Sequence, residues 1–136
     1  MQINVSTQQS RVPVAVLQLN GAMDASNYTE AIQKAQELYD GGARDLIVDL
    51  SNVPYISSAG LMAIHTMALV FNGMQTTNTQ SGRPSFRAVD PKRDQSVRDH
   101  VKLLNPQPQV DQVLDIVGLK LFFQIFNDLD SAVKSF

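Results

Sequence analysis

The stretch DLIVDLSNVPYISSAGLMAIHTMALVF, residues 45–71, decides the fold. Its first six residues are mostly apolar and bounded by turn signals, which is typical of a strand buried at the centre of a sheet. Pro54 lacks a backbone N–H and interrupts sheet pairing, so this strand must end near Val53. Apolar residues then recur at intervals of three and four, which predicts a helix over residues 57–71 with a stripe at Leu61, Ile64, Met67 or Ala68, and Phe71.

Two adjacent serines stand where this helix begins. Ser57 is a good N-cap, because its hydroxyl can accept a hydrogen bond from an amide two or three residues further on. Ser58 is then the first helical residue, beside free backbone N–H groups and the positive end of the helix dipole. Gly60 has no side chain and is expected to leave this backbone uncovered. A phosphate on Ser58 would find donors there, but a helix cap needs no phosphate, so both interpretations stay open.

The residues before this stretch predict a hairpin and a helix. Residues 2–6 alternate weakly and residues 12–19 are rich in β-branched side chains, so we expect two strands paired across the polar turn QQSR. Residues 28–39 place apolar side chains on one helical face, and two glycines at 41 and 42 are expected to end this helix with a left-handed cap. Asp24 to Asn27 offer several N-cap candidates for it.

The last third of the chain predicts four short elements. We expect a strand at residues 100–104 and a helix at 110–117 that Gly118 caps. Residues 121–126, LFFQIF, predict a last apolar strand or edge, and residues 128–136 a terminal helix with Asn127 or Asp128 as its cap. Because strands and helices alternate after an initial hairpin, the fold class is α/β with a mixed sheet.

Residues 72–99 interrupt this pattern. They are polar, contain two prolines and two glycines, and show no usable periodicity. We expect a flexible insertion in a single domain that spans residues 1–136. A partner could contact the basic side chains of the insertion, which are Arg83, Arg87, Lys92, Arg93 and Arg98. Its hydroxyls are weaker candidates for modification, at Thr76, Thr77, Thr79 and Ser81.

Composition excludes several kinds of function. The 136 residues contain no cysteine, which rules out disulfides and thiolate metal sites, and a net charge of −2 gives no general case for nucleic-acid binding. His65 and His100 lack a carboxylate cluster at ligand spacing, so no metal is expected. The first twenty residues lack a signal-peptide pattern, and no apolar run approaches the ~18 residues of a membrane span, so we expect a cytoplasmic protein without membrane insertion.

Catalytic and cofactor motifs are absent as well. The chain contains neither a G-x-S-x-G elbow nor a G-x-x-x-x-G-K-S/T loop. The carboxylates Asp45 and Asp49 flank the central strand, where they are expected to bracket it. We therefore expect a protein that is not an enzyme and holds no cofactor.

Three motifs resemble those of STAS domains, the anti-sigma-factor antagonist family. Residues 45–61 resemble the family signature, a strand ending V-D-L-S-x-V followed by an aromatic residue, an aliphatic residue and D/S-S-S/T/A-G-L. Residues 19–24, LNGAMD, resemble the family's L-x-G-x-L-D, and residues 113–126 are similar to its ending V-L-x-x-x-G-L-x-x-L-F-x-I-F. The resemblance covers nearly the whole chain except residues 72–99. It implies a sheet of four or five strands with helices mainly on one face.

The resemblance also implies a bacterial signalling mechanism called partner switching. In it the antagonist binds an anti-sigma factor that is also a GHKL-type serine kinase, which frees the sigma factor or another client. The kinase then phosphorylates the antagonist at the helix N-terminus, the complex dissociates, and a PP2C-type phosphatase resets the cycle.

The family motif assigns roles to five residues of this chain. Ser58 is the expected phosphoacceptor, and Ser57, which stands where the family usually has Asp, is a weaker one. Ala59 occupies the third motif position and cannot accept phosphate. Asp24 matches the acidic residue beside the phosphorylation site, or caps the first helix, and both roles are compatible. We expect Asp24, Ser57, Ala59 and Gly60 to surround the phosphosite and contact the partner.

Two other functions fit the same family. A STAS module can act as an unphosphorylated scaffold in a larger signalling or transport assembly. It can also bind a nucleotide or an apolar molecule, here near Asp24 and Ser58, although the chain has no Gly-rich phosphate loop for this purpose.

Overall fold

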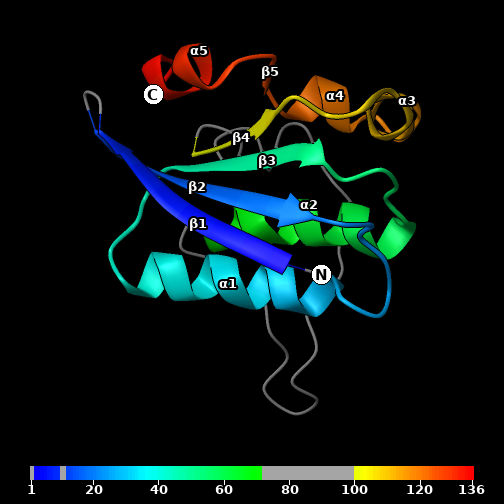
Figure 1. The fold of residues 1–136 in the computed structure, drawn as a ribbon, viewed down its shortest axis with the longest axis horizontal. Helices are drawn as coiled ribbons and strands as arrows, with labels where there is room; N and C mark the ends of the chain where they lie inside the picture. The colour runs from blue at the N-terminus through cyan, green and yellow to red at the C-terminus, as the bar shows by residue number, and fades with distance from the viewer. Residues whose placement is uncertain (1, 10–11, 72–99) are drawn as a thin grey trace.

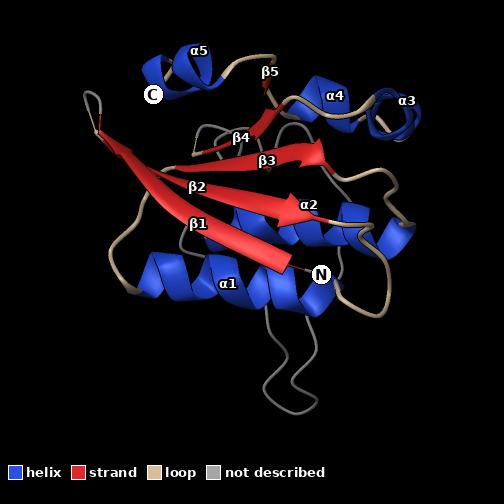
Figure 2. Cartoon of the chain, in the orientation of Figure 1, coloured by secondary structure: helices blue, strands red, loops and turns tan. Residues whose placement is uncertain are grey.

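The computed structural model describes residues 2–9, 12–71 and 100–136. In chain order the elements are β1 (Gln2–Gln9), β2 (Pro13–Asn20), α1 (Tyr28–Asp40), β3 (Leu46–Asn52), α2 (Ser58–Val70), β4 (Val101–Leu104), α3 (Pro108–Ile116), α4 (Leu119–Phe122), β5 (Ile125–Phe126) and α5 (Leu129–Lys134). Figures 1 and 2 show these elements as one sheet with helices packed around it.

The five strands form one mixed sheet in the order β1-β2-β3-β4-β5. β1 and β2 form the expected antiparallel hairpin, whereas the strands from β2 to β5 run parallel to one another. Parallel neighbours need crossover connections. α1 supplies the connection from β2 to β3, and α2 lies in the connection from β3 to β4. The predicted α/β class and mixed sheet are therefore confirmed.

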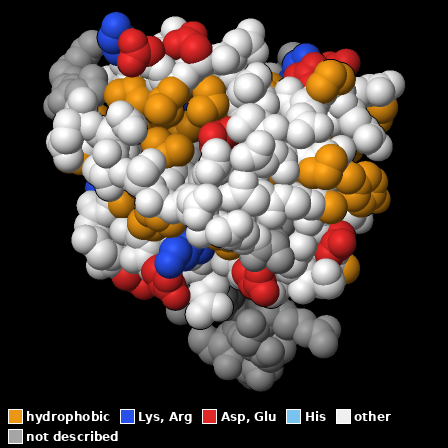
Figure 3. Space-filling view, in the orientation of Figure 1, with side chains coloured by type: hydrophobic (Ala, Val, Ile, Leu, Met, Phe, Trp, Pro, Cys, Tyr) orange, Lys and Arg blue, Asp and Glu red, His pale blue; other side chains and the backbone are white. Residues whose placement is uncertain are grey.

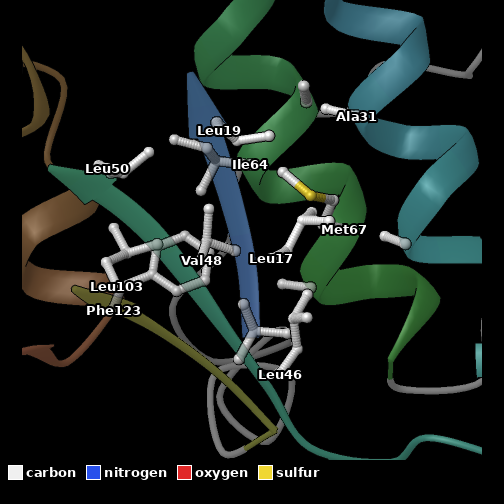
Figure 4. Packing of buried hydrophobic residues seen from close by; sticks show 14 of the residues in the cluster. Leu17, Leu19, Ala31, Leu46, Val48, Leu50, Ile64, Met67, Leu103 and Phe123 are labelled. Atoms are coloured by element: carbon white, nitrogen blue, oxygen red, sulfur yellow. The ribbon is translucent and has the colours of Figure 1, made fainter. Parts of the chain in front are cut away.

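The sheet is covered on both faces by different helices. On one face, alternate side chains of β2, β3 and β4 pack with those of α1 and α2, and Figure 4 shows Leu17, Val48 and Met67 meeting there. On the opposite face, the intervening side chains, such as Val16 and Ile47, pack against α5. The long helices thus share one face, as expected, while the short terminal helix covers part of the other.

Helix α2 is buried more widely than its sequence pattern predicted. Instead of a stripe, every residue from Ala63 to Val70 is buried. The reason is that α2 lies against the sheet and also packs against α1, where the rings of Tyr39 and Phe71 meet edge to face at 5.7 Å. Apart from the buried His65 and Thr66, the enclosed part of α2 is apolar on every side, so the pattern of its sequence does not single out one face.

The glycines after α1 and α3 end these helices as the sequence predicted. Gly42 has a φ of +111° and Gly118 a φ of +83°, both in the left-handed region that favours glycine. The other glycine of the pair, Gly41, is right-handed, with a φ of −78°. The left-handed cap after α1 is therefore formed by its second glycine.

The prediction of one apolar strand at residues 121–126 is wrong in its first half. Leu119–Phe122 forms the short helix α4, and only Ile125–Phe126 pairs with β4. A short apolar run suits either a buried helical turn or a buried strand, so its periodicity could not separate the two. The next prediction is confirmed, because Asp128 caps α5 by accepting a hydrogen bond from the Ser131 amide at 2.8 Å.

A buried lysine joins α5 to the sheet. Lys102 of β4 is 5% exposed, and its Nζ donates to the Ser135 carbonyl at 3.0 Å and to the Ser135 hydroxyl at 2.8 Å. The same ammonium group lies 4.3 Å from the centre of the Phe136 ring. Hydrogen bonds and a cation–π contact together compensate for removing this charge from water.

The predicted insertion at 72–99 lies outside the described residues. The two residues that flank it contact the rest of the domain. Phe71 is buried at the end of α2, and the His100 carbonyl accepts a hydrogen bond from the Leu46 amide at 2.8 Å. Among the residues that the structure describes, no helix is both long and apolar enough to cross a membrane.

We expect Leu17→Ala to lower the free energy of unfolding by about 2–5 kcal/mol, since it removes a fully buried side chain from the centre of the larger core. Urea denaturation followed by circular dichroism measures this change. Ile116→Ala is the control, because Ile116 is 74% exposed and should change stability by less than about 0.5 kcal/mol. Equal effects of the two substitutions would contradict the packing described here.

Candidate functional site

The site is built where β3 ends and α2 begins. After Asn52 the chain turns tightly, with the Val53 amide donating to the Leu50 carbonyl at 3.0 Å. The residues that follow lie beside the loop that leaves β2, since Ile56 and Met23 form an isolated parallel bridge. Two hydrogen bonds fix this bridge, from the Met23 amide to the Tyr55 carbonyl at 3.0 Å and from the Ser57 amide to the Met23 carbonyl at 2.9 Å.

Ser57 is the N-cap of α2, as the sequence predicted. Its backbone is extended, and its hydroxyl accepts a hydrogen bond from the Gly60 amide at 3.3 Å. Its carbonyl accepts the first helical bond, from the Leu61 amide at 2.9 Å. The side chain is half-buried. Ser57 therefore satisfies one of the amides that every helix start leaves without a partner.

Ser58 is the first residue of α2 and is exposed. Within the part of the chain that the structure describes, its hydroxyl makes no hydrogen bond. Ala59 follows it with no hydroxyl, and the first turn of the helix contains no acidic residue. The amides of this turn carry a partial positive charge, so an anion on Ser58 would be stabilised by them.

Gly60 is buried, which corrects the expectation that it leaves the backbone uncovered. A Cβ atom at this position would lie 2.6 Å from Cγ1 of Ile56 and 3.0 Å from the Met23 carbonyl oxygen. No side chain fits that space, so Gly60 is needed for close contact between α2 and the Met23 loop. Sequence analysis missed Met23 and Ile56 as supports of the site, and the only signal for them was the glycine itself.

Asp24 lies next to Met23 and so belongs to the loop that contacts Ser57. Its Oδ1 accepts hydrogen bonds from the Ser26 hydroxyl at 2.5 Å and from the Ser26 amide at 2.9 Å. The hydrogen bond from the hydroxyl, and to a smaller extent that from the amide, holds the pKa of the Asp24 carboxyl below its ordinary value. The group is therefore a carboxylate at neutral pH.

The alternative role of Asp24 as the cap of α1 is wrong. Asn27 occupies the N-cap position, and its side chain turns back to accept from the Asp24 amide at 2.9 Å and to donate to the Ala22 carbonyl at 2.8 Å. This arrangement closes the loop between β2 and α1 upon itself. Asp24 directly follows Met23, whose carbonyl accepts a hydrogen bond from the Ser57 amide.

Two further residues extend the surface around the serines. Tyr55, three residues before Ser58, is 46% exposed. Gln107, just before α3, donates from Nε2 to the Ser51 carbonyl at 2.9 Å. The loop after β4 therefore lies at the same end of the parallel strands as the loop after β3. Sequence analysis did not single out either residue. An exposed tyrosine beside a proline was the only available signal.

The remaining candidate side chains, Asp45, Asp49 and His100, lie in or just before β3 and β4. His100 Nδ1 and Asp45 Oδ1 lie 3.1 Å apart, at the other end of the parallel strands from the serines, where β3 and β4 begin. Asp49 accepts from the Ser51 hydroxyl at 2.7 Å, but it lies within β3, opposite Gln18 and Leu104, so the expectation that it brackets the strand is wrong. Within residues 2–9, 12–71 and 100–136, no cluster of acidic and histidine side chains could hold a metal ion.

Comparison with known proteins bears on this geometry. Residues 4–72 match the model of the STAS domain, a region that runs from within β1 past the end of α2. No curated protein matches the chain in sequence.

Several solved structures share the fold at low sequence identity. The tm1081 protein of Thermotoga maritima, described as an anti-sigma factor antagonist, matches with a TM-score of 0.67 and 18% identity over 96% of this chain and 92% of its own. An anti-sigma factor antagonist of Mycobacterium paratuberculosis matches with a TM-score of 0.64 and 17% identity, over 98% and 93% of the two chains.

A third match is the anti-sigma factor antagonist SpoIIAA in its unphosphorylated form. It has a TM-score of 0.63 and 16% identity, over 96% of this chain and 94% of its own. The Bacillus protein has also been solved in its phosphorylated form. The TM-scores of these structures show a common fold. The domain match covers half of the chain, so the chain belongs to the STAS domain family.

Proposed function

We propose that this chain is a phospho-switchable anti-sigma-factor antagonist and that Ser58 is its phosphoacceptor. In this mechanism the chain is a binding module, not an enzyme. Its unphosphorylated form binds a GHKL-type serine kinase that acts as an anti-sigma factor, phosphorylation releases it, and a PP2C-type phosphatase restores it. The observation that carries this assignment is the different environment of the two neighbouring serines.

Ser57 and Ser58 differ in how available their hydroxyls are. Ser57 is half-buried and its oxygen accepts from the Gly60 amide, so modifying it would remove the helix cap. Ser58 is exposed and does not contribute to the cap. A kinase could therefore reach the Ser58 hydroxyl without unfolding the helix start. This difference supports Ser58 over Ser57.

The electrostatics of the helix start favour a phosphate on Ser58. α2 is 13 residues long, and its first turn has no acidic side chain to oppose the new charge. Asp24 is a charged group on the neighbouring loop, whose Met23 carbonyl accepts a hydrogen bond from the Ser57 amide. A dianion beside this carboxylate would make the surface more acidic. That change would weaken a partner whose contact suits neutral hydroxyls.

The surroundings of Ser58 also suit a protein partner. Tyr55 exposes nearly half of its side chain beside the serines, and exposed tyrosines are frequent anchors in protein interfaces. The fold is shared with SpoIIAA, which has been solved with and without phosphate. Both facts support a surface that binds in one state and is released in the other.

We expect Ser58→Ala to bind the kinase and resist release, whereas Ser58→Asp should weaken binding by about 1–3 kcal/mol. The alanine has no hydroxyl to modify, and the aspartate places a negative charge at the helix start. Binding is measured by calorimetry with a GHKL-type kinase from the same genome, and phosphorylation by intact-protein mass spectrometry with ATP.

Ser57→Ala is the matched control for these variants. It should lower stability by about 0.5–2 kcal/mol through loss of the cap, yet still gain one phosphate. If the wild-type chain gains no mass at Ser58, or both Ser58 variants bind equally, Ser58 is not the switch. A chain that binds without ever being phosphorylated would instead act as a scaffold.

We further propose that residues 72–99 are an insertion on which neither the fold nor the switch depends. The residues on either side are held independently, Phe71 by the core and His100 by its bond to Leu46. We expect that replacing residues 73–95 with a short linker leaves cooperative thermal unfolding intact. Phosphorylation of Ser58 should continue at a similar rate. Loss of cooperative unfolding would show that the insertion belongs to the core.

A further inference from the structure

β1 forms one edge of the sheet and is unusually open to pairing. It pairs with β2 over eight residues in continuous register, and among the described residues no strand pairs with its other side. Its sequence QINVSTQQ has no charged residue, proline or glycine. Natural edge strands are normally protected by such residues, by a bulge or by being short. β1 has none of these protections.

The opposite edge of the sheet is protected. β5 contains only Ile125 and Phe126, and Asp128 follows it closely as the cap of α5. A two-residue edge offers few hydrogen-bonding groups to another strand. The difference between the two edges means that β1 is where an additional strand would pair.

The ladder shows which backbone groups of β1 point outward. The Ala15 amide donates to the carbonyl of Asp45, the residue just before β3. The backbone groups of the odd-numbered residues of β2 therefore point towards β3, and those of its even-numbered residues point towards β1. Val16 lies opposite Ser6, so the even-numbered residues of β1 bond to β2. The N–H and C=O groups of Ile3, Val5 and Thr7 therefore point away from the sheet.

We propose that β1 pairs antiparallel with β1 of a second copy of this chain, about a two-fold axis at Val5. This register sets Val5 opposite Val5 and Ile3 opposite Thr7, and each such pair exchanges two hydrogen bonds between outward-facing groups. Within the described residues, the sheet has two edge strands, and β5 has only two residues. β1 is uncharged, eight residues long and unpaired on one side, so β1 of a second copy matches it in length and charge.

The side chains agree with this pairing on both faces. Val5 is one of four exposed large apolar residues in the described part of the chain, at 38% exposure, and the two-fold axis would bring two copies of it together. On the other face, Asn4 would meet Ser6 and Gln2 would meet Gln8, all of them polar and uncharged. In Figure 3 the middle of the face on which β1 lies in Figure 1 is mostly white, the colour of the backbone and of side chains that are neither hydrophobic nor charged.

The resulting assembly is closed. Each copy uses its single open edge, and the protected β5 edges lie at the two ends of a ten-stranded sheet. The association should therefore stop at a dimer of twice 15.0 kDa instead of continuing into fibres. The proposal is independent of the phosphate switch, because none of its contacts involves Ser58.

Sedimentation velocity over about 1–200 µM tests this dimer, with Thr7→Pro as the informative variant. The Thr7 amide points outward, so proline removes a donor from the new pairing while leaving the bonds to β2 in place. We expect the dissociation constant of the dimer to rise about tenfold or more, because symmetry removes the donor from both copies. Thr7→Ala keeps the amide and should dimerise like the wild type.

Val5→Lys is a second variant that does not alter the backbone. It would place two ammonium groups opposite each other on the axis, so we expect a monomer whose dimerisation recovers partly in high salt. Circular dichroism verifies that each variant is folded. A wild-type chain that stays monomeric at 200 µM overturns the proposal and leaves the edge to a foreign strand. So does a folded Thr7→Pro or Val5→Lys variant that dimerises unchanged.

Discussion

The central strand β3 carries apolar side chains on both of its faces, and both must be kept from water. Leu46, Val48 and Leu50 pack towards α1 and α2, whereas Ile47 packs towards α5. Such a strand can only lie between parallel neighbours joined by crossover helices. The chain must therefore leave β3 at its carboxyl end and enter a helix at once. The loop at that edge, with its two serines, is a direct consequence of burying β3.

The two serines show how strongly one position along a helix start changes the chemistry of identical side chains. Ser57 precedes the helix, so its oxygen turns inward to the Gly60 amide. Ser58 is the first helical residue and is exposed, so its hydroxyl takes no part in the cap. The cap keeps the helix start ordered, and an ordered start keeps unpartnered amides next to Ser58. Capping by Ser57 and the proposed phosphate acceptance by Ser58 would thus be complementary.

Most of the fold could be predicted because its signals are local. Pro54 ends a strand, Ser57 caps a helix, and Gly118 adopts a left-handed conformation, each for reasons that a few neighbouring residues supply. The contact of Gly60 with Met23 could not be predicted, since it joins residues 37 positions apart through backbone packing alone. Residues 121–126 were misjudged because an apolar run of six residues contains too few turns to reveal its period.

The parallel crossover through α2 also separates two features of the chain in space. Ser58 lies where β3 ends, whereas Phe71 and His100 lie where β3 and β4 begin, as the contacts of Phe71 with Tyr39 and of His100 with Asp45 show. The connection between these two residues is thus attached a full strand length from the serines. A change in the length or composition of that connection would therefore leave the helix start unaltered. The proposed switch at the serines and the length of the connection are thus separable properties of the chain.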